Sequence, residues 1–73
     1  MTFTVESLPS KNELAIFCDA KGLDTLVGQL KILQKLQGHV HLMTPSWGGQ
    51  ELTENKQGAE NLLIHHLRVT LVP

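Results

Sequence analysis

The chain has 73 residues, with six Lys plus Arg against seven Asp plus Glu and a formal net charge of −1. This length predicts one small domain, 1–73, and argues against an enzyme with a deep pocket built from many loops. The single Cys excludes an internal disulfide framework, and the scattered cations argue against nucleic acid as a partner. No apolar run is long enough to span a membrane, and no leader pattern opens the chain. We therefore expect a soluble cytoplasmic domain.

The chain is expected to begin with a β-hairpin. Residues 2–7 and 13–19 both alternate with a period of two, which is typical of strands. Turn-forming residues at 8–12 separate these segments, so the two strands should pair antiparallel. The alternation in the second strand places Leu14, Ile16 and Cys18 on the core-facing side. Cys18 is then expected to be a buried, unreactive thiol.

Residues 22–37 change to the period of an amphipathic helix. Leucines recur at spacings of three and four and form one apolar stripe. Gly38 follows where a left-handed cap residue is favoured. Gly28 interrupts the helix, and close packing of the helix on the sheet is the expected reason.

Two further strands complete the predicted sheet. Residues 39–44 alternate, with Val40 and Leu42 facing the helix, and the Pro and Gly residues of 45–49 end this strand. Residues 62–72 form the last and longest strand, after a polar loop. The prediction is a two-layer α+β fold in the order β-β-α-β-β, with an antiparallel sheet of about four strands and one amphipathic helix packed on one face.

The opposite face of this sheet has no second helix to cover it. An aromatic residue, a methionine, an arginine and histidines together are typical of an interaction surface. A merely solvated face is equally common in antiparallel sheets, so both interpretations stay open. The side chains expected on this open face are Thr2, Thr4, Ala15, Phe17, His39, His41, Met43, His66, Arg68 and Thr70.

Trp47 is the only tryptophan, and it lies in a loop bounded by Pro and Gly rather than in a periodic apolar stripe. Two interpretations apply to it. An exposed Trp in a loop is a candidate hot spot for partner binding. Alternatively, the ring folds back to cap the open end of a small core.

The histidines allow a metal site as an alternative. His39 and His41 lie two apart on one strand and project the same way. Together with His66 and Glu51 they would supply the ligand types that zinc prefers, although no longer metal motif accompanies them. Surface histidines are the simpler interpretation. No nucleophile elbow, carboxylate pair or phosphate loop is present, so we expect neither an enzyme nor a cofactor.

The segment His39–Leu52 (HVHLMTPSWGGQEL), followed by Asn61 and Leu63–Val69, resembles immunity protein family 32 of bacterial polymorphic toxin systems. The resemblance covers roughly residues 13–72. It implies a non-enzymatic antitoxin in the cytoplasm that binds a cognate toxin domain and neutralises it by occlusion. The positions that match the family pattern are His41, Trp47, Gly48, Gly49, Glu51, His65 and His66.

The expected partner is therefore the toxin protein, with no role for nucleic acid or a membrane. A small zinc-binding domain and a homodimer that buries the open sheet face remain the alternatives. The residues expected to contact the partner are Trp47, Glu51, His39, His41, His66 and Arg68.

Overall fold

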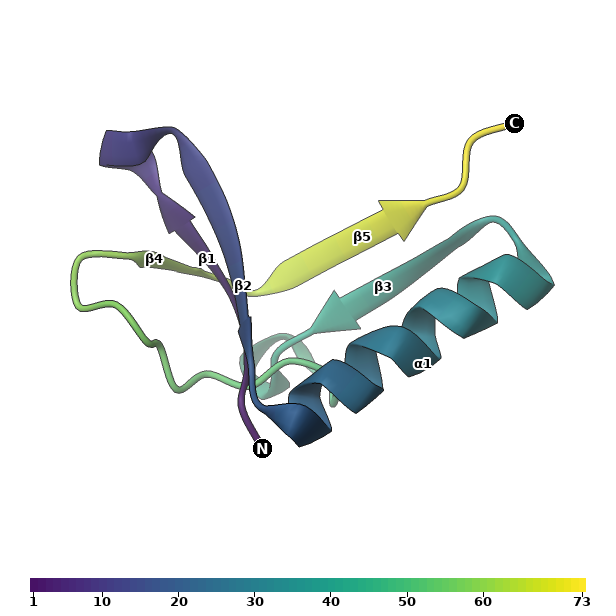
Figure 1. Ribbon diagram of the computed structural model, residues 1–73, viewed down its shortest axis with the longest axis horizontal. Helices are drawn as coiled ribbons and strands as arrows, with labels where there is room; N and C mark the ends of the chain where they lie inside the picture. The colour runs from purple at the N-terminus through teal and green to yellow at the C-terminus, as the bar shows by residue number, and fades with distance from the viewer.

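A computed structural model describes all residues, 1–73, and confirms an α+β fold in the order β-β-α-β-β (Figure 1). The helix is neither long nor apolar enough to cross a membrane. The elements are β1 (Phe3–Leu8), the 3-10 turn η1 (Pro9–Lys11), β2 (Glu13–Cys18), the helix α1 (Ala20–Leu36), β3 (His39–Met43), the 3-10 turn η2 (Pro45–Trp47), β4 (Leu62–Ile64) and β5 (His66–Thr70).

The N-terminal hairpin forms as expected. β1 and β2 pair antiparallel along their whole length, from Phe3 opposite Cys18 to Leu8 opposite Glu13. The connection η1 begins at a proline, which fixes φ, and ends at Asn12 in the left-handed region with φ 51°. Asparagine tolerates that conformation better than most residues, so this turn suits its sequence.

The predicted single sheet is divided into two, with strand orders β2-β1-β4 and β3-β5. The long last strand breaks at His65, whose carbonyl accepts a hydrogen bond from the Thr44 backbone N–H (3.0 Å). Because of this break, Ile64 and Leu67 both pack against the core, although alternation along one regular strand would place them on opposite faces. The expectation of one continuous strand over 62–72 is therefore wrong.

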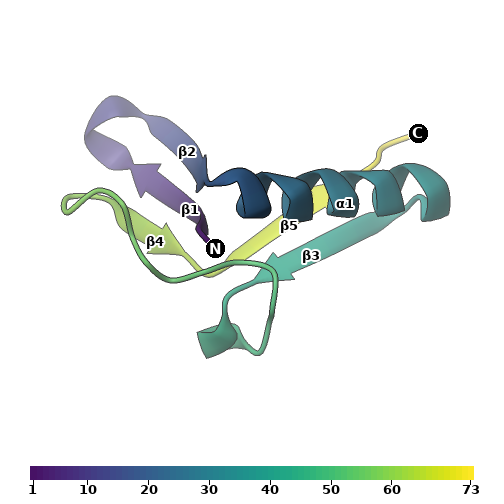
Figure 2. The ribbon, with the colours of Figure 1, turned by 60° about the horizontal axis from the view of Figure 1, so that its bottom comes forward.

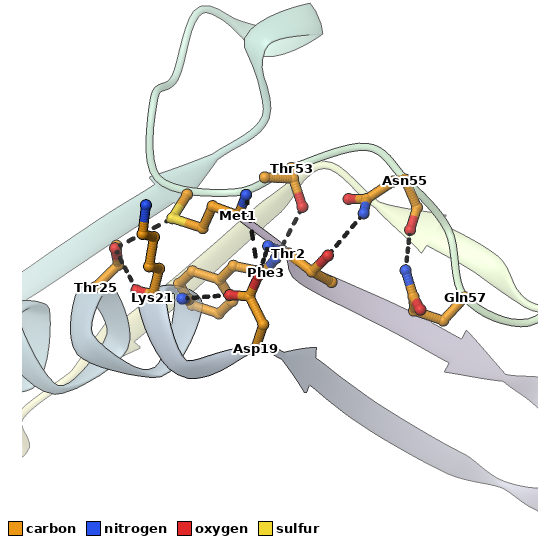
Figure 3. Close-up of polar contacts among 10 residues, drawn as sticks. Met1, Thr2, Phe3, Asp19, Lys21, Thr25, Thr53, Asn55 and Gln57 are labelled. Carbon is orange, nitrogen blue, oxygen red and sulfur yellow. Dashed lines mark hydrogen bonds and ion pairs between the residues drawn. The ribbon is translucent and has the colours of Figure 1, made fainter.

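The segment Leu52–Thr53 joins the two sheets. The Leu52 N–H donates to the Met43 carbonyl at the end of β3, and the Thr53 N–H donates to the Phe3 carbonyl in β1. The Thr53 hydroxyl accepts from the Phe3 N–H at 2.8 Å (Figure 3). This bridge places Leu52 in the core, which consists of Phe3, Val5, Leu42 and Leu52, with Leu26, Val40, Ile64 and Leu67 packed around them.

The helix starts at Asp19, whose carboxylate accepts from the backbone N–H groups of Gly22 (2.8 Å) and Thr2 (2.9 Å) (Figure 3). These bonds cap the helix and lower the pKa of Asp19. From there α1 extends over one face of the β3–β5 sheet, while the β1–β2 hairpin projects away from it (Figures 1 and 2). The helix therefore covers only part of the apolar face of the three-stranded sheet.

Three expectations about buried or closely packed residues are wrong. The strand register places Leu14, Ile16 and Cys18 on the same sheet face as Phe3 and Val5. All three are nevertheless exposed, because the helix does not cover this part of β2. Cys18 is thus an exposed thiol rather than a buried one. Gly28 is not a close-packing site either, since a Cβ atom there would meet nothing within 4 Å.

The other face of β1 is covered by the loop between η2 and β4. Thr4 and Glu6 are fully buried there, so Thr4 does not lie on an open face as expected. Burial by itself would raise the pKa of Glu6, but hydrogen bonds from Thr4, Gln57, Asn61 and Gly58 outweigh it and lower the pKa to about 2. The buried carboxylate thereby anchors the loop to the sheet.

Candidate functional site

The face of the β3–β5 sheet turned away from α1 carries the exposed polar side chains that the alternation predicts. His39 and His41 come from β3, and His66 and Arg68 come from β5. The antiparallel register places His41 opposite Arg68 and Met43 opposite His66. The intervening residue Leu42 is fully buried on the helix side. Four predicted contact residues therefore share one surface.

The imidazoles on this face form a contiguous row. The Nδ1 atom of His41 lies 2.7 Å from the Nε2 atom of His66, so one ring donates a hydrogen bond to the other. The ring centroids of His39 and His41 are 4.7 Å apart, and those of His41 and His66 are 4.9 Å apart. Each ring thus restricts the orientation of the next.

Trp47 extends this row at the end of β3. Its ring stacks on His65 with centroids 6.0 Å apart and an interplanar angle of 4°, and it lies 6.3 Å from the ring of His66. The Trp47 side chain remains 58% exposed, so it does not cap the core. We call Trp47, His66, His41 and His39 the aromatic row.

The turn that carries Trp47 is held by its own backbone. The N–H groups of Trp47 and Gly49 both donate to the Thr44 carbonyl at 2.9 Å, and the Gly48 N–H donates to the Pro45 carbonyl. Gly48 has φ 83°, in the left-handed region that favours glycine. A Cβ atom at Gly49 would lie 2.3 Å from the Met43 carbonyl oxygen, so only glycine fits there. The turn projects on the side of the β3–β5 sheet opposite α1 (Figure 2).

Two glutamates fix this turn to the rest of the protein. The carboxylate of Glu51 accepts from the Met43 N–H at 3.0 Å, and that of Glu54 accepts from the Ser46 N–H at 2.8 Å. The backbone bond from Ser46 is the main reason that the pKa of Glu54 is lowered. Glu51, predicted as a contact residue, therefore lies at the backbone edge of β3 and supports the turn.

Two positioning residues were missed by sequence reasoning. The Thr44 hydroxyl lies 2.7 Å from Nδ1 of His65, which orients the ring on which Trp47 stacks. Glu54 holds the turn from within a segment that the sequence shows only as a polar loop. No pattern in the sequence distinguishes either residue from its polar neighbours.

The charge on this surface is positive or neutral. The structure has one ion pair, between the N-terminal amine and Asp19, so Arg68 has no carboxylate partner. Desolvation, followed by the neighbouring His39, His66 and Arg68, lowers the pKa of His41. A lowered pKa favours the neutral form of the His41 ring, with the unpaired guanidinium of Arg68 beside it.

The histidines and Glu51 are not arranged as the alternative zinc site would require. No group of three or more His, Cys, Asp or Glu side chains is arranged to hold a metal ion. The facing nitrogens of His41 and His66 are hydrogen-bonded to each other, and the carboxylate of Glu51 is engaged with the Met43 N–H. The surface presents ring faces, ring edges and ring nitrogens in mutual contact, with one cation beside them.

Comparison with known proteins gives one family. The model for immunity protein 32 matches residues 13–67, a range that contains β2, α1, β3, the Trp47 turn and all of the aromatic row. No curated protein and no solved structure matches the chain. The matched range is well over half of the 73 residues. The chain belongs to the immunity protein 32 family.

Proposed function

We propose that this protein is a non-enzymatic antitoxin that binds a cognate toxin domain of a bacterial polymorphic toxin system and blocks its action by occlusion. Membership of an immunity protein family supports a toxin-immunity role. We place the binding surface at Trp47, because its ring is exposed and is held against the rings of His65 and His66 at the end of a row of imidazoles. We place the protein in the cytoplasm, where a producing cell would need such protection.

The physical case for the aromatic row begins with Trp47. A single Trp at the centre of an interface often accounts for a large share of the binding energy. Binding also costs less entropy when the side chain is already fixed in the free protein. The stacking on His65 and the hydrogen-bonded turn provide that fixation here. Trp47 therefore fits the role of an anchor that inserts into a pocket of the toxin.

The surroundings of the anchor suggest the chemistry of the toxin surface. Arg68 presents an unpaired guanidinium, which favours a carboxylate on the partner. His39, His41 and His66 supply ring faces and ring nitrogens that can pair with polar groups of either kind. We expect the toxin to present an apolar pocket beside acidic groups, with Glu51 contributing by supporting the Trp47 turn.

The proposal is tested by co-expressing the chain with the toxin domain encoded beside its gene. Survival of the cells and co-purification of the pair are the expected results. The variant Trp47→Ala should then bind at least about 30-fold more weakly, the equivalent of about 2 kcal/mol. Leu36→Ala is the matched control, since Leu36 is also an exposed apolar residue (73%) and lies at the end of α1, outside the aromatic row.

Circular dichroism separates a binding defect from a folding defect. The Trp47→Ala variant should keep the spectrum of the wild type, because its ring is exposed and the turn is held by backbone bonds. Equal affinity of the Trp47→Ala and Leu36→Ala variants for the toxin would contradict the proposed surface. Failure of the wild-type chain to rescue cells or to form a complex would contradict the proposed function.

A further inference from the structure

A second surface of the protein is apolar, and it begins on the face of the three-stranded sheet that also carries core residues. Leu14, Ile16 and Leu62 share one face of the three-stranded sheet with the core residue Val5, because Ile16 and Ile64 pair with Val5, and Leu14 and Leu62 pair with Ser7. All three are exposed, since the helix does not extend over them. This surface is therefore a continuation of the core rather than an ordinary solvated face.

The helix carries a second group of exposed apolar side chains next to this surface, because its first turn at Gly22 packs against Cys18 of the same sheet face. Leu23, Val27 and Leu30 lie at the spacings of one helical stripe, and all three are exposed. An open groove of about 430 Å³ follows this stripe where it meets the end of β5, and it is lined by Val27, Leu30, Leu33 and Leu71, with Lys31 and Gln34 at its rim. We call Leu14, Ile16, Leu62, Leu23, Val27, Leu30 and Leu71 the aliphatic face.

The protein exposes more surface than a compact chain of its size, so there is apolar area available for a partner. The accessible surface is 5048 Å², whereas a compact monomer of 8.1 kDa exposes about 4,500 Å². The radius of gyration is 12.5 Å, against roughly 11 Å for a compact domain of this length. The excess of roughly 550 Å² approaches the approximately 800 Å² that each partner buries in a standard interface.

We propose that the aliphatic face is the interface of a homodimer. Its exposed side chains are Leu, Ile and Val, as in obligate homodimer interfaces that resemble a domain core cut in half. It contains no Trp, Tyr or Arg, the residues that dominate the hot spots of other interfaces. The only Trp and the only Arg of this chain lie in or beside the aromatic row. A second copy of the chain therefore fits this face better than a toxin does.

Two further features suit self-association. The net charge of −1 gives little repulsion between two copies. β5 has β3 as its only neighbouring strand, so its other edge is unpaired beside the groove that contains Leu71. An unpaired edge next to an apolar groove allows backbone pairing between copies in addition to side-chain burial. The dimer leaves the aromatic row free. The proposal of a dimer does not depend on the proposed toxin binding.

Sedimentation of the wild-type chain over a range of concentrations tests the proposal, with a mass of twice 8.1 kDa as the expected result. Leu30→Glu should raise the dissociation constant at least about 100-fold, because it would bury an unpaired charge. His39→Glu is the matched control on the opposite face and should leave the mass unchanged. A monomeric wild type, or dissociation by His39→Glu and not by Leu30→Glu, would overturn the proposal.

A measurement on the wild-type chain guards against a folding defect in the variants. In an NMR dilution series, the methyl signals of Val27, Leu30 and Leu71 should shift as the dimer dissociates, while the ring signals of His39 and His41 stay in place. The reverse result would place the dimer on the open sheet face, the location expected from the sequence, and would refute the aliphatic face as the interface.

Discussion

The buried carboxylate of Glu6 allows a quantitative prediction. Its two oxygens accept four hydrogen bonds: Oε2 from the Thr4 hydroxyl (2.6 Å) and the Gln57 N–H (2.9 Å), and Oε1 from the Gly58 N–H (3.1 Å) and the Asn61 amide (2.9 Å). The pKa falls from 4.5 to about 2. At 1.36 kcal/mol for each pKa unit, the charged form of Glu6 stabilises the fold by about 3 kcal/mol at neutral pH.

The substitution Glu6→Gln removes this charge and keeps the shape. The Gln amide group must replace one of the two oxygens. In the position of Oε2 it faces the Gln57 N–H, and in the position of Oε1 it faces the Gly58 N–H. In both orientations a backbone donor meets another donor. We expect the free energy of unfolding at pH 7 to fall by about 3 kcal/mol, a large share of the stability of so small a domain.

Urea unfolding followed by circular dichroism measures this difference, and its pH dependence identifies the cause. A lowered pKa in the folded state gives stability that is fully present above pH 4.5 and is lost as the pH falls toward 2. The gap between the wild type and Glu6→Gln should therefore shrink to less than about 1 kcal/mol at pH 2.5. The pKa values of Asp19 and Glu54 are also lowered, but both groups are common to the two proteins, so their contributions cancel in the difference.

The exposed Glu13 on β2 provides the control substitution, since its carboxylate takes part in no hydrogen bond of the fold. Glu13→Gln should leave the stability unchanged within about 0.5 kcal/mol at every pH. If Glu6→Gln costs less than about 1 kcal/mol at pH 7, or if its cost is the same at pH 7 and pH 2.5, the carboxylate does not anchor the loop in the way inferred here.

Two other predictions concern stability. Gly28→Ala should stabilise the protein by about 0.5–1 kcal/mol, because Ala favours a helix and its Cβ meets open space; a lower melting temperature would contradict this. Since the pKa of His41 is lowered in the folded state, the unfolded chain binds the extra proton and stability should fall as the pH drops below about 6.5. His41→Gln should flatten the dependence of melting temperature on pH between 7.5 and about 5.5, and an unchanged slope would refute it.

Local patterns were sufficient to predict the N-terminal hairpin, the helix and the open face of the smaller sheet. The alternation of His39 to Met43 correctly placed the two exposed histidines opposite the buried Leu42. The same reasoning brought His66 and Arg68 to that face because residues 66–70 are a regular strand. These predictions succeeded where each strand keeps its period, since a period of two directly determines which face a side chain occupies.

The predictions failed where non-local contacts decide the outcome. At the break, the His65 carbonyl bonds to Thr44, which is distant in sequence, and Ile64 and Leu67 both pack against the core, as they would not in one continuous strand. The exposure of Leu14 and Cys18 depends on the direction in which the helix leaves the hairpin, which no local pattern encodes. The anchoring of a loop by Glu6 likewise requires partners fifty residues away.

We expect the two proposed surfaces to have separate roles, because their compositions differ and because α1 and the Trp47 turn lie on opposite sides of the β3–β5 sheet (Figure 2). Aliphatic side chains bury apolar area without directional contacts, which suits a permanent contact between two copies. Trp47 and its neighbouring rings instead provide an aromatic anchor with defined geometry, which suits a distinct partner. Since α1 lies on one side of the β3–β5 sheet and the Trp47 turn lies on the other (Figure 2), a second copy on the aliphatic face leaves both aromatic rows accessible. A complex of two chains with two toxin domains is the stoichiometry that follows. A Leu30→Glu monomer that still binds one toxin domain with wild-type affinity would demonstrate that independence, and a monomer that loses the toxin would show that the two surfaces are coupled.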